Sequence, residues 1–422
     1  MSAAGLEVGT TKVPAKLGRR RLTPAQWAIA AFGIILIVSV LRLVTGANDI
    51  DSSGLLIAAF GLAVPIAMAG LGGLWSERAG VVNIGLEGMM ILGTWGAGFL
   101  GYHMGPWMGL LGAIVGGAIG GVIHAVATVN FGVDHIVSGV ALNIVALGFA
   151  KYLAVRFFSP LPGGGPTQSP PLPELPSLTV PGLSPALGTI ESNHWFFVSD
   201  LAGVLRALVT NVSVVTILAV LLFVATWWIL WRTPFGLRLR SVGESPVAAE
   251  SLGVNVLRYK FVAVTISGGL AGLGGGFLAL VAANLFRDGQ TGGRGYIGLA
   301  AMIFGNWRPG GLLAGSALFG YTDAAQLRGG GTTVHAFLLA LAVLLVLIGI
   351  WQVVRKGRIT QGVLAVVVGI GVGLWYFLTD SVPTELSGTT PYVTTLLVLA
   401  FASQRLRMPA ADGQIYRKGE GH

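Results

Sequence analysis

The stretch SGLLIAAFGLAVPIAMAGLGGLWSERAGVVNIGLEGMM, residues 53–90, contains the pattern that decides the fold. Residues 53–74 hold no charged side chain, and a helix of about 20 apolar residues crosses the roughly 30 Å of hydrocarbon in a bilayer. Polar residues follow directly, and residues 86–102 are again mainly apolar. We therefore expect a membrane-spanning helix, a polar break and a second helix here.

Apolar runs and short polar connections alternate along the rest of the 422-residue chain. Only 10% of its residues are charged, whereas an ordinary soluble protein has about 25%, and its mean hydropathy is +0.78. This composition excludes a soluble enzyme, and the absence of Cys excludes a disulfide scaffold or a Cys-ligated metal site. The sequence predicts an all-α fold, a polytopic transmembrane helical bundle of about 10–12 spans with broken or re-entrant helices. After a first span from Trp27 to Val44, the expected spans are 53–74, 86–102, 106–130, 136–157, 210–231, 261–283, 295–306, 311–327, 334–354, 361–379 and 391–404.

Basic residues give the expected orientation. The net charge is +9, but lysines and arginines form short clusters between the apolar runs, which indicates membrane topology rather than nucleic-acid binding. Such clusters lie in segment 1–25, in the loop 232–260, at 355–358 and after residue 404. Cytoplasmic loops are enriched in Lys and Arg, and alternate counting places all four clusters on one side. We therefore expect a multi-pass plasma-membrane protein with both termini in the cytoplasm.

The longest connection, residues 158–208, falls outside the cell in this count. Its prolines are dense between Pro160 and Pro176. Because proline interrupts regular backbone hydrogen bonding, this composition predicts a segment without regular structure, either an ordered external loop or a spacer.

Two short segments in different halves of the chain are similar. Ile84–Met90 reads IGLEGMM and Ile297–Ile303 reads IGLAAMI, and the two would run in opposite directions across the membrane. Interrupted apolar segments at corresponding positions of two halves indicate a binding site near the middle of a transporter. The pair therefore suggests an inverted repeat, unless the similarity is chance in a chain with 65 glycines.

Five residues in or near the apolar runs form the expected solute pathway. Glu87 lies at membrane depth, where a carboxyl group is costly unless it faces a cavity or a partner, so it either serves the pathway or binds a neighbouring helix terminus. Asn83, four residues earlier, would share its helix face if the stretch is helical. Asn143 would hydrogen-bond either another helix or the solute. Met89 and Asn306 complete the set, and Asn306 lies in an expected tight turn.

The loop 232–260 contains an expected short helix within residues 244–253. Ser245 suits the N-cap, Pro246 suits the first turn, and two alanines follow. An exposed helix with small apolar side chains indicates docking in the groove of a partner, whereas the alternative is an ordinary connecting loop. The docking residues that we expect are Glu244, Ala248, Ala249, Glu250 and Gly253.

Catalytic and metal-binding motifs are missing from the sequence. It has no Gly-x-x-x-x-Gly-Lys-Ser/Thr phosphate loop, so ATP-driven work would need a separate subunit. The six histidines show no metal-ligand spacing. The Gly-x-Gly-x-x-Gly pattern at 293–298 enters an apolar run without a preceding strand, and we interpret it as coincidence. We therefore expect no catalytic residue, metal or cofactor in this chain.

Residues 75–90 resemble the signature of permease subunits of bacterial ABC importers for nucleosides and simple sugars, in the larger family that includes ribose and branched-chain amino-acid permeases. The resemblance continues through Asp134–Gly139, Gly236–Gly253 and Ala300–Gly311. The last of these contains the long stretch Phe-Gly-Asn-Trp-Arg-Pro-Gly-Gly. The resemblance covers about residues 50–327 and favours the nucleoside branch over the amino-acid branch.

This resemblance implies a permease that forms the translocation path of an ATP-driven importer in the bacterial plasma membrane. The implied partners are a cytoplasmic ATP-binding subunit with two fused nucleotide-binding domains, a second homologous permease, and an extracytoplasmic substrate-binding protein, often a lipoprotein. ATP would be hydrolysed by the partner, and the segment 244–253 is similar to the coupling helix of the family. The resemblance leaves open whether the solute is a purine nucleoside, a pyrimidine nucleoside or a sugar.

The expected organisation follows from these segments. After the cytoplasmic tail 1–25, the permease core is 26–327, and the tail with the last span is 391–422. The family pattern has only a short connection before the last span, so residues 328–390 are expected to be an inserted pair of spans. Two rival functions are a self-sufficient secondary transporter or channel, in which Glu87 would bind protons or cations, and a membrane-embedded enzyme.

Overall fold

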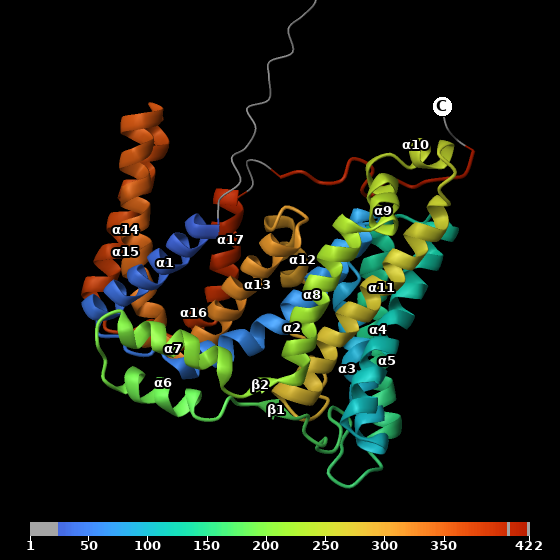
Figure 1. Cartoon of the computed structure of the whole chain (residues 1–422), viewed down its shortest axis with the longest axis horizontal. Helices are drawn as coiled ribbons and strands as arrows, with labels where there is room; N and C mark the ends of the chain where they lie inside the picture. The colour runs from blue at the N-terminus through green and yellow to red at the C-terminus, as the bar shows by residue number, and fades with distance from the viewer. Residues whose placement is uncertain (1–23, 403–405, 420–422) are drawn as a thin grey trace, which may run out of the picture.

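The computed structural model describes residues 24–402 and 406–419, which form a helical bundle with one two-stranded ribbon (Figure 1). Seven helices of the described part are long and apolar enough to cross a membrane, so the chain is a multi-pass membrane protein. The predicted all-α bundle is confirmed. Almost all of the expected tail 1–25, including its basic cluster, lies outside the described residues.

The helices differ in length, and three of the long ones continue into a π-helical turn. The long helices are α1 (Pro24–Thr45), α2 (Ser53–Arg78), α3 (Leu86–Met104), α4 (Pro106–Ala125, continued by Val126–Asn130), α5 (His135–Phe157), α8 (Val214–Arg232), α11 (Val256–Phe277, continued by Leu278–Ala282), α13 (Pro309–Ala324, continued by Ala325–Gly329), α14 (Gly330–Lys356) and α15 (Ile359–Leu378). The short elements are α6 (Leu183–Ser192), α7 (Val198–Val209), α9 (Pro234–Glu244), α10 (Pro246–Ser251), α12 (Arg294–Phe304), α16 (Thr384–Ser387), α17 (Thr390–Ala402), and the paired strands β1 (Ser177–Leu178) and β2 (Val212–Ser213).

The expected broken helices are present. Helix α12 has 11 residues and is therefore about 16 Å long, roughly half of what a bilayer requires. A non-helical segment precedes it at 283–293, and a tight turn at 305–308 connects it to α13. Helix α3 likewise follows a non-helical segment, at 79–85. The two interrupted segments thus lie after α11 and after α2, which pack against each other.

The expectation that residues 158–208 lack regular structure is wrong for their second half. Residues 159–176, where the prolines are dense, form turns and irregular backbone, as predicted. Residues 183–209 instead form α6 and α7. Pro185 is compatible with α6 because it lies in the first turn, where a helix needs no backbone N–H from it.

Glycine allows the central helices to approach closely. Helix α4 packs on α11 where Gly117 faces Gly268, and a Cβ atom on either residue would collide with the backbone of the other. Close packing of small residues is how helices associate in lipid, where the hydrophobic effect gives little drive. Helices α2, α3, α4 and α11 form this tight core, while α14 and α15 stand beside α1 (Figure 1).

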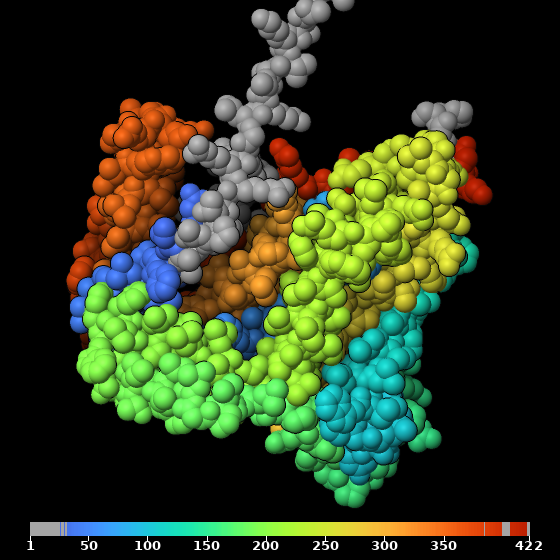
Figure 2. All heavy atoms as spheres, viewed as in Figure 1, coloured from blue at the N-terminus to red at the C-terminus, as the bar shows by residue number. Residues whose placement is uncertain are grey.

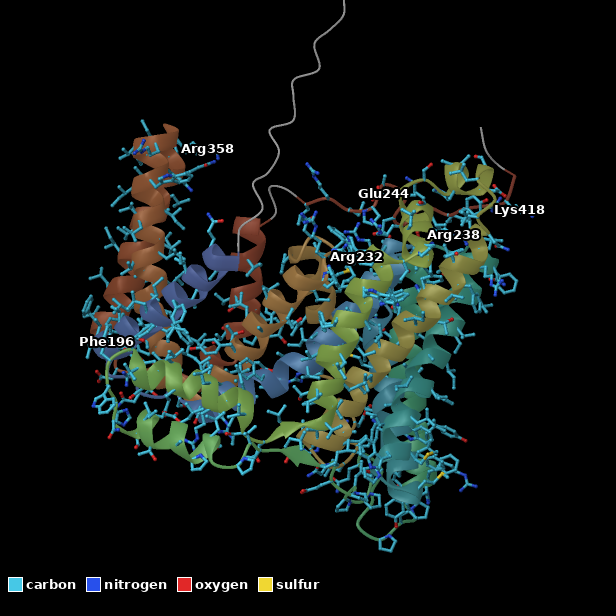
Figure 3. The ribbon with its side chains drawn as sticks, viewed as in Figure 1. Phe196, Arg232, Arg238, Glu244, Arg358 and Lys418 are labelled. Atoms are coloured by element: carbon cyan, nitrogen blue, oxygen red, sulfur yellow. The ribbon has the colours of Figure 1, made fainter. Side chains whose placement is uncertain are left out.

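Basic residues from distant parts of the chain gather at one end of the bundle. Arg232, Arg238, Arg358 and Lys418 all lie toward this end, whereas Phe196 lies toward the other (Figure 3). We call it the basic end. It also carries α10 and the C-terminal segment (Figure 1).

Candidate functional site

The first broken segment positions Asn83 and Glu87. Helix α2 ends at Arg78, and Gly80 has a φ of +79°, a conformation that favours glycine, so the chain turns back into the bundle. Helix α3 begins only at Leu86. Asn83 therefore precedes the helix that contains Glu87, and the expectation that the two share a helix face is wrong.

Glu87 binds the N-terminus of α12. Its two carboxylate oxygens accept hydrogen bonds from the backbone N–H groups of Gly293 (2.9 Å) and Gly295 (2.7 Å). The first N–H groups of a helix lack acceptors within the helix and carry partial positive charge. A carboxylate accepts their hydrogen bonds and also offsets this charge. Only 7% of Glu87 is exposed. This geometry confirms the interpretation that Glu87 is bound to a neighbouring helix terminus.

Asn143 of α5 makes the corresponding contact with α3. Its Oδ1 accepts a hydrogen bond from the N–H of Gly88 (2.7 Å), in the first turn of α3. Its Nδ2 donates to the carbonyl of Ile84 (3.0 Å) and to the hydroxyl of Tyr296 in α12 (2.9 Å). Asn143 thus connects α3 and α12, and its predicted hydrogen bonding between helices is confirmed.

Asn83 and Met89 complete this cluster. Both side chains are fully buried, and Nδ2 of Asn83 donates to Oγ of Ser267 in α11 (2.9 Å) and lies 3.4 Å from the sulfur of Met89. Oδ1 of Asn83 accepts no hydrogen bond from any residue in the described part of the chain. Buried amide oxygens usually have a partner, so this atom is the unsatisfied acceptor of the cluster.

The cluster lies at mid-depth of the bundle. Gly298 packs against the backbone of Ile66 and Gly70, about halfway along α2. From there α12 runs to the basic end, where the carbonyl of Trp307 accepts a hydrogen bond from Nε of Arg78 (3.0 Å). Helix α3 runs the other way. We call this cluster of Asn83, Glu87, Met89, Asn143 and Tyr296 the meeting point.

The similar segments of the sequence are not in structural register at the meeting point. Ile84–Met90 crosses the start of α3, whereas Ile297–Ile303 lies wholly inside α12. Asn306 is also elsewhere. It lies in the turn after α12, has a φ of +56°, and its Oδ1 accepts a hydrogen bond from the N–H of Arg407 (2.8 Å).

The expected short helix is present as α10. Oγ of Ser245 accepts a hydrogen bond from the N–H of Ala248 (3.4 Å), as an N-cap does, and Gly253 beyond the helix has a φ of +80°. Ala249 faces inward and is buried against Val242. Ala248 and Glu244 are exposed, and Glu250 is half-buried.

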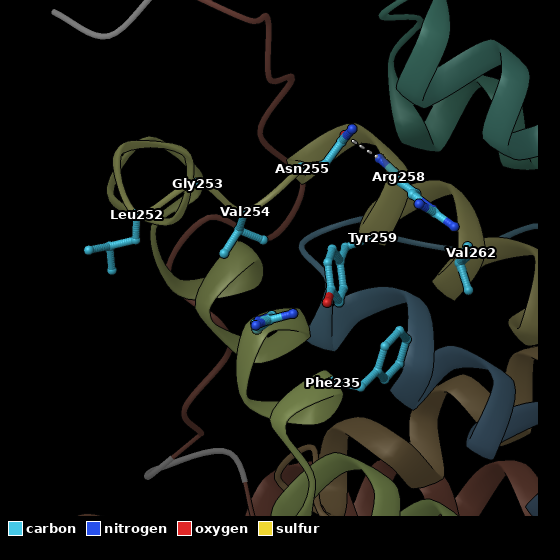
Figure 4. Close-up of a pocket in the computed structure, with 9 residues that line it drawn as sticks. Phe235, Leu252, Gly253, Val254, Asn255, Arg258, Tyr259 and Val262 are labelled. Carbon is cyan, nitrogen blue, oxygen red and sulfur yellow. Dashed lines mark hydrogen bonds between the residues drawn. The ribbon is translucent and has the colours of Figure 1, made fainter.

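A pocket of about 580 Å³ lies beside α10 (Figure 4). Phe235 and Arg238 of α9 line one side, and Arg258 and Tyr259 of α11 line the other. Leu252 at its rim is 84% exposed. Leu252 thus places an exposed apolar side chain beside two arginines at the basic end.

The C-terminal segment crosses the basic end, which sequence reasoning missed. Residues 406–418 extend from α17 along α9 and α10 (Figure 1). The N–H of Ala411 donates to the carbonyl of Gly243 (2.9 Å), and Nζ of Lys260 donates to the carbonyl of Gln414 (3.4 Å). Together with the bond from Arg407 to Asn306, these contacts join α9, α11 and the turn after α12. We call residues 406–418 the strap.

Asp412 anchors the strap inside the protein. Only 8% of this residue is exposed, and burial raises the pKa of Asp412 to about 7. Glu77, Arg78 and Lys260 are the charged or titratable groups that face it. The signal for the strap in the sequence was weak, because an acid within a polar tail usually indicates a solvated residue.

No group of three His, Cys, Asp or Glu residues in the described ranges is placed to hold a metal ion. The arrangement therefore provides buried polar groups at mid-depth and an exposed short helix beside a pocket at one end.

The chain matches the permease component of branched-chain amino acid transport systems over residues 55–350. It belongs to this family. The match includes both half-helices, the meeting point and α10, and it ends inside α14. No solved structure matches the chain significantly.

Three curated relatives of this permease are named as ABC transporter permeases. The chain is 40% identical over 277 residues to the guanosine ABC transporter permease protein NupQ of Bacillus subtilis. This match covers 63% of the chain and 80% of the relative. The chain is 33% identical over 366 residues to the nucleoside ABC transporter permease protein NupC of Lactococcus lactis, and the match covers 84% of the chain and 94% of the relative. The chain is 30% identical over 373 residues to a putative glucose ABC transporter permease protein of Haloferax volcanii, and the match covers 87% of the chain and 98% of the relative.

Proposed function

We propose that this chain is the permease subunit of an ATP-binding-cassette importer and forms the translocation path for a nucleoside. The observation that carries the proposal is the meeting point, where α3 and the half-span helix α12 begin at mid-depth and polar side chains hold their N-termini. Two relatives named for nucleoside or guanosine transport support the solute class. A nucleoside is polar and uncharged, which suits amide groups beside an apolar surface.

Asn83 is the residue that we assign to the solute. Its buried Oδ1 is the unsatisfied acceptor of the cluster, and Met89 beside it offers an apolar surface to a base. Glu87 and Asn143 are occupied by helix N-termini, so we assign them the positioning of α12 and α3. Asn306 lies at the basic end, where it would respond to docking rather than contact the solute.

The basic end is proposed to be cytoplasmic, with both termini on that side, and to bind the ATPase. Helix α10 offers Leu252 and Val247, which are 84% and 48% exposed, and Glu244 and Glu250 flank this surface. ATP would be bound and hydrolysed by the partner, a subunit with two fused nucleotide-binding domains. A second homologous permease and an extracytoplasmic substrate-binding lipoprotein would complete the importer.

The bonds of Glu87 count against a secondary transporter. In that rival function its carboxyl group would bind and release protons or cations during transport. Its two oxygens instead accept hydrogen bonds from two backbone N–H groups of α12, so both oxygens already hold a helix terminus of this chain.

The test is uptake of radiolabelled guanosine, uridine and ribose by cells that express the complete importer, with Asn83→Ala as the variant. We expect saturable, ATP-dependent nucleoside uptake, reduced at least tenfold by Asn83→Ala at an equal amount of assembled complex. Asn193→Ala is the matched control, because Asn193 is exposed after α6. Uptake of ribose alone would overturn the nucleoside assignment. Nucleoside uptake without the ATPase would overturn the importer.

A further inference from the structure

Helix α7 exposes its apolar side. Val198, Leu205 and Leu208 are 48%, 43% and 54% exposed, and their spacing of seven and three residues places them on one face of the helix. The turn before α7 continues this surface with Trp195 and Phe196, which are 58% and 47% exposed. We call these five residues the apolar ledge.

The polar side of the α6–α7 pair faces the protein. Asp200 is 3% exposed and forms an ion pair with Arg42 of α1 (2.9 Å). Arg206 pairs with Glu191 of α6 (2.9 Å), and Glu191 also accepts a hydrogen bond from the N–H of Ser53 (2.7 Å). A helix on a protein surface in water buries its apolar side and exposes its polar side, so α7 has the reverse arrangement.

The ledge is continuous with the exposed side of a spanning helix. The ring of Phe197 lies 6.1 Å from the ring of Phe32 in α1. Phe32 is 50% exposed, and Ile29 and Leu36 of α1 are exposed as well. Helices α6 and α7 lie across the long helices rather than along them, at the end away from α10 (Figure 1). In the space-filling view they form one surface directly beside α1 (Figure 2).

We propose that α7 and the preceding turn bind the membrane–water interface, with the apolar ledge inserted among phospholipid acyl chains. Amphipathic helices that lie in the interface insert their apolar side by about 5–10 Å, and Trp is enriched at this depth. The ledge contains no charged residue, because Asp200 and Arg206 of the same helix are turned to the protein. A surface for a soluble binding protein would carry a polar rim, so the continuity with α1 favours lipid.

This site would fix the tilt of α1 and α2. The ion pair of Asp200 with Arg42 and the bond of Glu191 to Ser53 attach the α6–α7 pair to the connected ends of these two helices. Anchoring in the interface therefore sets the depth at which α2 meets the half-helices. The inference does not depend on which solute the permease carries.

Site-directed spin labelling tests the proposal cleanly, because the chain has no native Cys. Leu205→Cys and Leu208→Cys would be labelled with a nitroxide in the assembled importer in lipid nanodiscs, and accessibility to oxygen and to a polar nickel chelate would be measured. Ser192→Cys is the control, because Ser192 is an exposed polar residue at the C-terminal end of α6, outside the apolar ledge. We expect an oxygen-to-nickel accessibility ratio severalfold higher at 205 and 208 than at 192.

Equal ratios at the three positions would overturn the proposal, since the ledge would then face water. Low accessibility to both reagents at 205 and 208 would also overturn it, because a protein partner would then cover the ledge. As a second measurement, brominated lipids should quench less fluorescence in Trp195→Phe than in the native chain. Equal quenching would contradict insertion of the turn before α7.

Discussion

The meeting point and the α10 surface differ in how their polar and apolar groups are satisfied. At the meeting point, Glu87 and Asn143 are buried and form hydrogen bonds with five backbone or hydroxyl groups. At α10, Leu252 projects away from the chain and is 84% exposed. Glu87 and Asn143 are satisfied within this chain, whereas we propose that a partner covers the second region. Changes in the first should therefore reduce stability, and changes in the second should reduce coupling alone.

Replacing Glu87 should have the largest effect on stability. Glu87→Ala leaves the N–H groups of Gly293 and Gly295 without acceptors inside the bundle, at a cost of about 1–3 kcal/mol for each group. We expect a lower Tm of the purified importer and loss of uptake, with Glu87→Gln intermediate because it keeps one acceptor oxygen. The control is Glu385→Ala, since Glu385 is exposed. An unchanged Tm for Glu87→Ala would contradict the positioning role.

Replacing Asn143 should have the next largest effect. Asn143→Ala removes the acceptor for the N–H of Gly88 and the donor to Tyr296, at a cost of about 1–3 kcal/mol. Tyr296→Phe should cost less, because it removes one acceptor. In a double-mutant cycle measured by thermal unfolding, Tyr296→Phe should add little in the Asn143→Ala background. Fully additive effects would show that the two half-helices are not coupled through this bond.

Much of this comparison could be predicted from the sequence. Apolar length was enough for the long helices, though in the described residues fewer of the expected spans are long enough to cross a membrane than the sequence suggested, and Ser245 with Pro246 was enough for α10, because these signals are local. The role of Glu87 depends on which helix terminus lies beside it, and Gly293 is more than 200 positions away. The strap and the α6–α7 pair were missed for a similar reason. Tertiary contacts bury Asp412 and Asp200, whereas the sequence around each is that of an exposed loop.

The pH dependence of the strap should be smaller still. The pKa of Asp412 is raised to about 7 in the folded protein, above the ordinary 3.8, so the folded strap favours the neutral carboxyl group. The stability that the neutral carboxyl group of Asp412 gives to the packed strap is complete below about pH 4 and is lost as the pH rises through 7. A nitroxide on Ile415→Cys should become more mobile between pH 6 and pH 8.5, and Asp412→Asn should remove most of this change. Mobility that falls with rising pH would contradict the assignment.

Replacing Leu252 should leave stability unchanged, because its side chain makes almost no contact within the chain. Leu252→Asp should keep the Tm and the folding of the permease. Leu386→Asp is the matched control, since Leu386 is an exposed leucine of α16 outside α10. A drop in Tm for Leu252→Asp that Leu386→Asp does not show would remove the distinction between the two regions.

The most direct test of coupling is ATP-driven guanosine accumulation in proteoliposomes that contain the complete importer, with Leu252→Asp compared with Leu386→Asp. Our account predicts that Leu252→Asp abolishes accumulation and separates ATP hydrolysis from transport, while Leu386→Asp transports normally. Normal accumulation by Leu252→Asp, with the ATPase bound, would contradict docking through α10.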